Sequence, residues 1–104
     1  GKSPEAEAEP ILRACKGRIF ALAVEGREYT SEGFAETLKT LCDRGEEITF
    51  VIGSSCGLSP RVKRAADGLV SFSRMTFPHQ LMRVVLCEQI YRAFMINAGA
   101  EYHK

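Results

Sequence analysis

Two segments of the chain are rich in apolar residues, and the first of them is continuous, with no alternation of apolar and polar residues. The first covers residues 18–24 (Arg-Ile-Phe-Ala-Leu-Ala-Val) and the second covers residues 47–52 (Glu-Ile-Thr-Phe-Val-Ile). Segments of this kind are typical of parallel strands that are covered on both faces. A shorter apolar segment at residues 69–72 predicts a third strand. Residues 25–27 (Glu-Gly-Arg) follow the first strand and predict a turn.

Apolar residues with helical spacing lie between the first two strands. Phe34, Leu38 and Leu41 fall on one face of a helix predicted over residues 31–42. Gly45 follows this helix, and glycine is common just after the carboxyl end of a helix. This spacing therefore predicts a helix that ends shortly before the second strand.

Three further helices are predicted from their first residues and their composition. Residues 3–5 (Ser-Pro-Glu) have the pattern of a helix start, but Pro10 interrupts it, so the predicted helix covers residues 10–16. Residues 59–66 begin with Ser-Pro and predict a short basic helix. A long helix is predicted over roughly residues 79–97.

Strands that alternate with helices predict a single α/β domain over residues 1–104, built on a parallel sheet. In such sheets, ligands bind outside the carboxyl ends of the strands. The loops after residues 24, 52 and 72 are all expected at this edge. A sheet of three strands is small, however, and leaves hydrophobic edges exposed.

The charge of the chain is small but unevenly distributed. Its 104 residues are 45% hydrophobic and 26% charged, and the net charge of +1 argues against a general polyanion binder. Residues 1–52 hold seven Lys/Arg against ten Asp/Glu, a balance of −3, whereas residues 53–104 hold seven against three, a balance of +4. This asymmetry is consistent either with a phosphate-bearing partner or with ordinary surface charge.

Neither a metal site nor a membrane segment is expected. The cysteines Cys15, Cys42, Cys56 and Cys87 form no C-x-x-C pair, and the chain has only two histidines. Charged residues interrupt the apolar run at residues 81–96, and no secretory segment is visible. A reduced, cytoplasmic protein is the default expectation.

Residues 53–57 (Gly-Ser-Ser-Cys-Gly) lie between the second strand and a helix. Glycines there let the backbone approach a ligand closely, and exposed amides hold polar ligand groups. The same letters match the G-x-S-x-G elbow of α/β hydrolases, with Ser55 as nucleophile and Asp67 and His79 as its partners. Against this alternative, residues 58–60 delay the helix that follows an elbow serine directly. A plain strand-to-helix turn is a third interpretation.

The polar residues of the long helix also have purely structural interpretations. His79 at its start is consistent with a helix cap. Glu88 and Arg92 have the spacing of an ordinary ion pair on one helix. Arg83 and Arg92 are about two and a half turns apart and need not share a face. Residues 102–104 (Tyr-His-Lys) have the composition of an ordinary chain end.

Three ordered blocks carry a resemblance to a known family. They are residues 22–26 (Leu-Ala-Val-Glu-Gly), residues 52–59 (Ile-Gly-Ser-Ser-Cys-Gly-Leu-Ser), and residues 71–92 together with the Tyr-His-Lys end. From about residue 9 onward, the chain resembles the small knotted (SPOUT-class) methyltransferases that modify a pseudouridine of 23S ribosomal RNA. The resemblance implies an α/β-knot fold with a C-terminal trefoil knot, a rare exception to the usual rules of chain connection. It also implies a homodimer, S-adenosylmethionine as cofactor, and methylation at N3 of the base in the ribosome.

The resemblance further assigns roles to individual residues. The methyl transfer requires N3 of the base to lose a proton while the sulfonium methyl is held in line. His103 or His79 is the expected proton acceptor, and an arginine is expected to stabilise charge on the base carbonyl. The residues expected to face RNA or the methyl-transfer site are His79, Arg83, Arg92, Tyr102 and His103. The cofactor pocket is expected to comprise Leu22, Gly53, Phe72, Ser73, Arg74, Met75, Thr76 and Phe77.

The sequence departs from the family pattern in three places. Ser54 follows Gly53 where the family usually has a second glycine, and Ala23 stands where the family usually has an aspartate. The family's first strand and helix are absent from the sequence. These departures leave a second interpretation open, in which the chain is a non-catalytic, truncated homologue that keeps only the fold and the dimer surface. A small serine hydrolase that uses Ser55 is the third.

Overall fold

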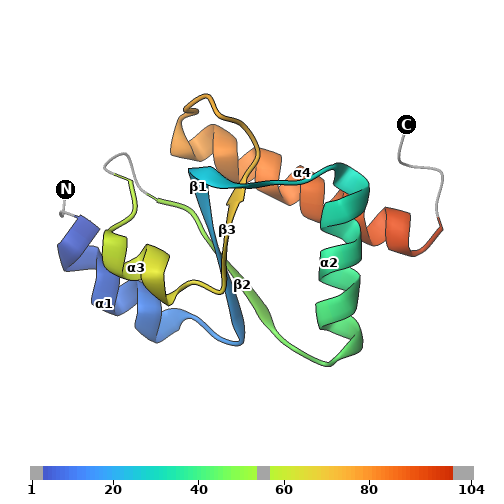
Figure 1. The fold of residues 1–104 in the computed structure, drawn as a ribbon, viewed down its shortest axis with the longest axis horizontal. Helices are drawn as coiled ribbons and strands as arrows, with labels where there is room; N and C mark the ends of the chain where they lie inside the picture. Colours follow the sequence, from blue (N-terminus) through green and yellow to red (C-terminus); the bar gives the residue numbers. More distant parts are fainter. Residues whose placement is uncertain (1–3, 54–56, 100–104) are drawn as a thin grey trace.

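The computed structural model describes residues 4–53 and 57–99. Helices and strands alternate along the chain, which confirms the α/β class (Figure 1). The predicted bounds of the long helix are confirmed, and those of the second and third helices and strands agree to within one residue at each end. In chain order the elements are α1 (Pro4–Ala14), β1 (Arg18–Glu28), α2 (Ser31–Asp43), β2 (Ile48–Val51), α3 (Pro60–Ala65), β3 (Gly68–Ser71) and α4 (His79–Asn97).

The three described strands form one parallel sheet in the order β2-β1-β3. Arg18–Ala21 of β1 pair with Ile48–Val51 of β2, and Phe20–Leu22 pair with Gly68–Val70 of β3. The chain moves from β1 to β2 in one direction and then back across β1 to β3. Crossovers of one hand place α2 and α3 on opposite faces of the sheet, as Figure 1 shows.

One face of the sheet packs against α2 and α4. Phe34 and Leu38 of α2 are buried together with Ala93 of α4 and Val70 of β3. The ring of Phe34 also meets the ring of Phe72 edge to face, with centroids 5.7 Å apart. This core therefore holds the first residue after β3 in place.

The other face of the sheet packs against α1 and α3. Ala8 of α1, Ala21 of β1, Val51 of β2 and Val62 of α3 form its buried cluster. Successive side chains of a strand point to opposite faces, so Ala21 faces these helices whereas Leu22 packs against the α2 and α4 side. Because both faces are covered, the strands read as continuous apolar runs.

Pro10 does not break α1. The helix runs from Pro4 to Ala14 with Pro10 inside it, so the helix start predicted at residue 10 is wrong. A proline inside a helix removes one hydrogen bond and crowds the preceding turn. Burial of Ala8 and the packing of Ile11 and Leu12 on the sheet offset this local cost.

β1 continues through the predicted turn. The strand runs to Glu28, so the turn predicted at residues 25–27 is wrong. Gly26 makes the continuation possible, because a Cβ atom at this position would lie only 2.6 Å from the carbonyl carbon of Leu69. Only glycine lets two backbones approach this closely.

The pairing between β1 and β3 contains an irregularity. Val70 of β3 is the partner of Leu22 and again of Arg27, so residues 23–26 lie between two rungs of the ladder. We call these four residues the β1 bulge. Bulges of this kind redirect side chains at the ends of sheets and next to binding sites.

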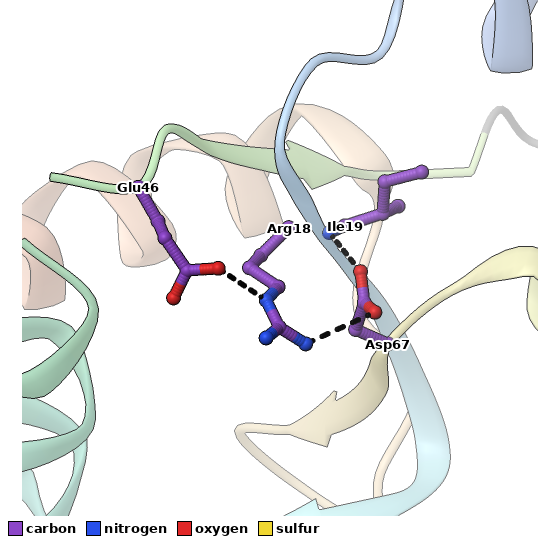
Figure 2. Close-up of polar contacts among 4 residues, drawn as sticks. All are labelled: Arg18, Ile19, Glu46 and Asp67. Carbon is purple, nitrogen blue, oxygen red and sulfur yellow. Dashed lines mark hydrogen bonds and ion pairs between the residues drawn. The ribbon is translucent and has the colours of Figure 1, made fainter. Parts of the chain in front are cut away.

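A polar network closes the amino-terminal edge of the sheet (Figure 2). Arg18 Nε donates to Glu46 Oε1 at 2.8 Å, and Arg18 Nη1 lies 3.5 Å from Asp67 Oδ1. The hydrogen bond to Glu46 raises the pKa of Arg18 above its ordinary value. Arg18 begins β1, Glu46 precedes β2 and Asp67 precedes β3. The network therefore ties together the starts of all three strands.

The described residues show neither a membrane-spanning helix nor a metal site. No helix among them combines the length and the apolar character that crossing a membrane requires. Within residues 4–53 and 57–99, no three His, Cys, Asp or Glu side chains gather where they would hold a metal ion. Cys15, Cys42 and Cys87 are free thiols.

Candidate functional site

A cavity of about 770 Å³ lies at the carboxyl-terminal edge of the sheet. Small-molecule sites usually measure about 300–1,000 Å³. The walls come from the β1 bulge, the loop after β2 and the segment between β3 and α4, which meet because the strands are parallel. The described residues that line the cavity are Leu22, Ala23, Val24, Glu25, Ile52, Gly53, Gly57, Leu58, Lys63, Val70, Phe72, Ser73, Met75, Thr76, Phe77, Pro78, His79 and Met82.

Most residues expected at a cofactor pocket line this cavity. Arg74 is the exception, because it lies exposed at a bend and does not belong to the lining. The residues that do line it are Leu22, Gly53, Phe72, Ser73, Met75, Thr76 and Phe77. The sequence blocks that resemble a cofactor-binding family therefore converge on one concave surface.

Gly53 is required by the path of its own loop. A Cβ atom at Gly53 would lie 2.8 Å from the carbonyl carbon of Gly57 and 3.0 Å from the backbone N of Leu58. A larger residue would collide with this returning backbone before it reached a ligand. The close approach predicted at Gly53 is thus a contact between two parts of the protein.

Hydrogen bonds within the chain shape the segment after β3. Ser71 Oγ donates to the carbonyl oxygen of Ser73 at 3.0 Å, and the backbone N of Met75 donates to Ser73 Oγ at 2.9 Å. Ser71 is buried, and the neighbouring Phe72 packs against the core. The segment therefore leaves the sheet in a fixed direction, with Ser73 and Met75 at the cavity.

Glu25 and Lys63 are the only Asp, Glu, Lys or Arg residues among the described lining residues. Lys63 Nζ lies 2.7 Å from Glu25 Oε2. This hydrogen bond lowers the pKa of the Glu25 carboxyl, which is therefore ionised at neutral pH. The rest of the wall is largely apolar, as is typical of sites for organic ligands.

His79 reaches the cavity from the start of α4. Pro78 is the N-cap residue of this helix, and no side chain makes a capping hydrogen bond, so the interpretation of His79 as a helix cap is wrong. Its side chain belongs to the cavity lining. Met82, one turn further along, lines the same cavity, which places two side chains of one α4 face at the site.

The two arginines expected to face RNA lie along α4, outside the cavity lining. Arg92 Nε donates to Glu88 Oε1 at 2.9 Å, and Arg92 Nη2 lies 2.7 Å from the same oxygen. This is the ion pair that their spacing predicts. Arg83 is exposed. Tyr102 and His103, also expected at this site, fall outside the described residues.

The position of Asp67 contradicts the hydrolase alternative. Asp67 precedes β3, and its Oδ2 accepts a hydrogen bond from the backbone N of Ile19 at 2.8 Å (Figure 2). His79 follows β3 and lies at the cavity, beyond the opposite end of that strand. A catalytic triad requires the acid to hydrogen-bond the histidine, and a whole strand separates these two residues. Ser55 lies outside the described residues.

The sequence pattern does not single out Glu25, Lys63 or Met82 as cavity residues. Glu25 falls within a segment that is predicted to be a turn. Lys63 falls within a short basic helix, where a lysine is expected to be an ordinary surface residue. Met82 has a usable signal, because it lies three residues after His79 and therefore shares its helix face. No comparable spacing links Glu25 to Lys63, which only the fold brings together.

The chain is similar to known proteins over almost its whole length. A sequence profile described as "Predicted SPOUT methyltransferase" matches residues 2–103. A protein of Ligilactobacillus salivarius named ribosomal RNA large subunit methyltransferase H is 56% identical over 103 residues, which cover 96% of this chain and 65% of the relative. A protein of the same name from Streptococcus thermophilus is 59% identical over 101 residues, which cover 94% of this chain and 64% of the relative.

These matches include the whole described site but only part of each relative. The chain spans about 65% of the length of the curated relatives it matches. The residues matched by the profile include every described wall of the cavity. Membership of this family also implies the trefoil knot expected for the C-terminal segment. The α/β chain, with its cavity at the carboxyl ends of three parallel strands, belongs to the SPOUT methyltransferase family.

Proposed function

We propose that the protein methylates large-subunit ribosomal RNA and uses S-adenosylmethionine as the methyl donor. The observation that carries this proposal is the cavity of about 770 Å³, built by three converging segments in a SPOUT methyltransferase domain. The relatives described above are named as ribosomal RNA large subunit methyltransferases. The finer specificity, for N3 of a pseudouridine in 23S ribosomal RNA, belongs to the same proposal.

The cavity fits this cofactor in size and in chemistry. An adenine ring needs apolar and aromatic neighbours, whereas ribose and amino-acid groups need a few polar ones. Phe72 and Phe77 supply aromatic surface, and Ser73 and Thr76 supply hydroxyl groups. When bound, the cofactor supplies an electrophilic methyl group on a sulfonium centre. The residues proposed to hold it are Leu22, Gly53, Phe72, Ser73, Met75, Thr76 and Phe77.

His79 is proposed to handle the proton of the target base. It lines the cavity at the start of α4, beside the residues proposed to hold the cofactor. A neutral imidazole accepts a proton readily at physiological pH. Methylation at N3 requires the loss of the proton on N3. His103 is the alternative proton acceptor.

Arg83 and Arg92 are proposed to contact RNA from α4. The Glu88 carboxylate orients the guanidinium of Arg92, and Arg83 is exposed. Guanidinium groups bind phosphates and base carbonyls in a fixed geometry. The net charge of +1 provides too few phosphate contacts to hold naked RNA at physiological salt. The assembled ribosome is therefore the proposed substrate.

A two-fold homodimer through α4 is part of the proposal. Leu81, Val84, Tyr91 and Phe94 are 47%, 64%, 51% and 54% exposed, respectively. Separations of three and seven residues align them along one side of the helix. Leu86 on the opposite side is buried. An exposed apolar stripe of this kind is typical of an interface, and a second copy of the same stripe covers it under two-fold symmetry.

Calorimetric titration and a methyl-transfer assay test this proposal. We expect S-adenosylmethionine to bind in the micromolar range, with about −8 kcal/mol at 1 μM. We expect radiolabelled methyl groups to reach ribosomal RNA in unmodified assembled ribosomes but not in naked RNA. No heat at millimolar cofactor would instead support a non-catalytic homologue that keeps only the fold and the dimer surface. Binding without transfer would contradict the catalytic part alone.

A further inference from the structure

We propose that the Glu25–Lys63 ion pair is a latch that fixes the β1 bulge as one wall of the cavity. In this arrangement Lys63 is a positioning residue, which acts on the site through Glu25. The effect on cofactor affinity rests on the proposed function. The latch itself is a property of the free protein and is testable without any ligand.

The β1 bulge has little support from the sheet. β1 pairs with Val70 on both sides of the bulge, so residues 23–26 stand outside the ladder. Gly26 holds the base of the bulge against Leu69, with a separation too small for a side chain. Val24, within the bulge, leaves 46% of its surface exposed, so apolar burial holds it less firmly than the core residues of β1. A polar contact from outside the sheet therefore adds to the support of the bulge.

α3 provides a fixed point for such a contact. Val62 is fully buried, and its backbone N donates to Ser59 Oγ, itself buried, at 3.2 Å. Arg61 is paired with Glu9 of α1. Lys63 therefore extends from a helix that is held both by the core and by its neighbour.

The ion pair joins the β1 bulge to this helix. Lys63 Nζ and Glu25 Oε2 are 2.7 Å apart, and the two residues are 38 positions apart in the chain. The described cavity lining holds no other Asp, Glu, Lys or Arg that competes for either partner. The latch thus sets the spacing between the bulge and α3 at the cavity. A wall fixed before binding spares the ligand the cost of ordering it.

Hydrogen exchange of the backbone amides of Arg27 and Glu28, where pairing with β3 resumes after the β1 bulge, tests the latch in the free protein. We expect these amides to exchange about three- to fivefold faster in Lys63→Met and in Glu25→Gln. Loss of a partly exposed ion pair should increase the population of the open, exchanging state by about this factor. Lys39→Met is the matched control, because Lys39 Nζ lies 3.1 Å from Asp43 Oδ2 in a comparable surface pair on α2. Unchanged exchange in both latch variants would overturn the proposal.

Rescue variants separate positioning from a general loss of structure. Lys63→Arg, and the double reversal Glu25→Lys with Lys63→Glu, should restore slow exchange. The Kd for S-adenosylmethionine should rise about three- to fivefold in Lys63→Met and return to normal in Lys63→Arg. If the unchanged protein binds no cofactor, the proposed function fails while the exchange data still decide the latch. If it binds and Lys63→Met binds equally well, the positioning role is overturned.

Discussion

Asp67 holds both backbone groups of Ile19. The backbone N of Asp67 donates to the carbonyl oxygen of Ile19 at 2.7 Å, and Asp67 Oδ2 accepts from the backbone N of Ile19 at 2.8 Å. The same carboxylate lies beside Arg18 (Figure 2). The residue before β3 thus fixes where β3 begins against β1. Because the cavity walls leave from the other ends of these strands, this contact also helps to set the geometry of the site.

Asp67→Ala should therefore destabilise the fold. The substitution removes the acceptor for the backbone N of Ile19 and one partner of Arg18, at a cost of about 1 kcal/mol. Urea unfolding followed by circular dichroism measures the free energy of unfolding. Asp43→Ala is the control, because it breaks only an exposed pair with Lys39 and should cost less than about 0.5 kcal/mol. Equal losses in the two variants would contradict the anchoring role of Asp67.

Gly53→Ala should weaken cofactor binding by about tenfold or more, since a shift of the loop costs more than about 1.4 kcal/mol. The added Cβ would lie 2.8 Å from the backbone of Gly57, so the loop after β2 has to move away from its present position at the cavity. Calorimetry with S-adenosylmethionine measures the effect. Gly33→Ala on α2 is the control, since its new Cβ meets only the hydroxyl oxygen of Thr30. Unchanged affinity in Gly53→Ala would show that this loop does not shape the pocket.

Val84→Asp should dissociate the proposed dimer. Val84 is 64% exposed in the middle of the apolar stripe, and two-fold symmetry places a pair of new charges in one interface. Sedimentation at tens of micromolar protein distinguishes the two masses. Glu36→Lys, which alters charge at an exposed position of α2, should leave the dimer intact. A monomeric mass for the unchanged protein would remove the dimer from the proposal.

Glu9 should contribute to the acid sensitivity of the fold. Its hydrogen bond with Arg61 lowers the pKa of the carboxyl below the ordinary value of 4.5. A group whose pKa is lowered in the folded state stabilises that state above its ordinary pKa. The contribution disappears as the pH falls through the lower, folded value. Thermal melts from neutral pH to pH 3 should show a shallower decline for Glu9→Gln than for the unchanged protein. Identical declines would show that the pair does not affect stability.

Arg83→Ala and Arg92→Ala should each lower methyl transfer to ribosomes by about tenfold, the effect of losing one charge-assisted hydrogen bond. Neither arginine lines the cavity, so the Kd for S-adenosylmethionine should stay the same. Deletion of residues 102–104 should have the same pair of effects. Lys16→Ala, an exposed change next to the amino-terminal edge of the sheet, is the control. Full transfer in the arginine variants would refute an RNA-facing role for α4.

Local pattern was sufficient to predict most of the fold. The apolar residues of α2 repeat with helical spacing, and Ser59-Pro60 marks the start of α3 with a side-chain cap that the structure contains. The loops expected after residues 52 and 72 do meet at the carboxyl edge of the sheet, whereas the third segment there belongs to β1. These features depend on neighbours within a few residues of one another, and sequence reports such neighbours directly.

Features that depend on distant contacts could not be predicted in this way. A glycine such as Gly26 is common both in turns and in bulges. Only its close approach to the backbone of Leu69 distinguishes the bulge from a turn. Pro10 predicts a helix break, because the neighbouring residues in the sequence do not show that α1 packs on the sheet. The Glu25–Lys63 pair joins residues of two different elements, which no spacing rule connects.

Val70 pairs with both Leu22 and Arg27, so the residues between them do not affect how β1 is aligned with β3. Pairing resumes at the same partner after the β1 bulge, so the bulge consumes no position on β3. The number of residues between Leu22 and Arg27 therefore bears on the cavity wall, part of which they form, and not on the pairing of the remaining rungs. The protein thus carries, within its central strand, a segment that shapes the cavity wall without setting the register of the sheet.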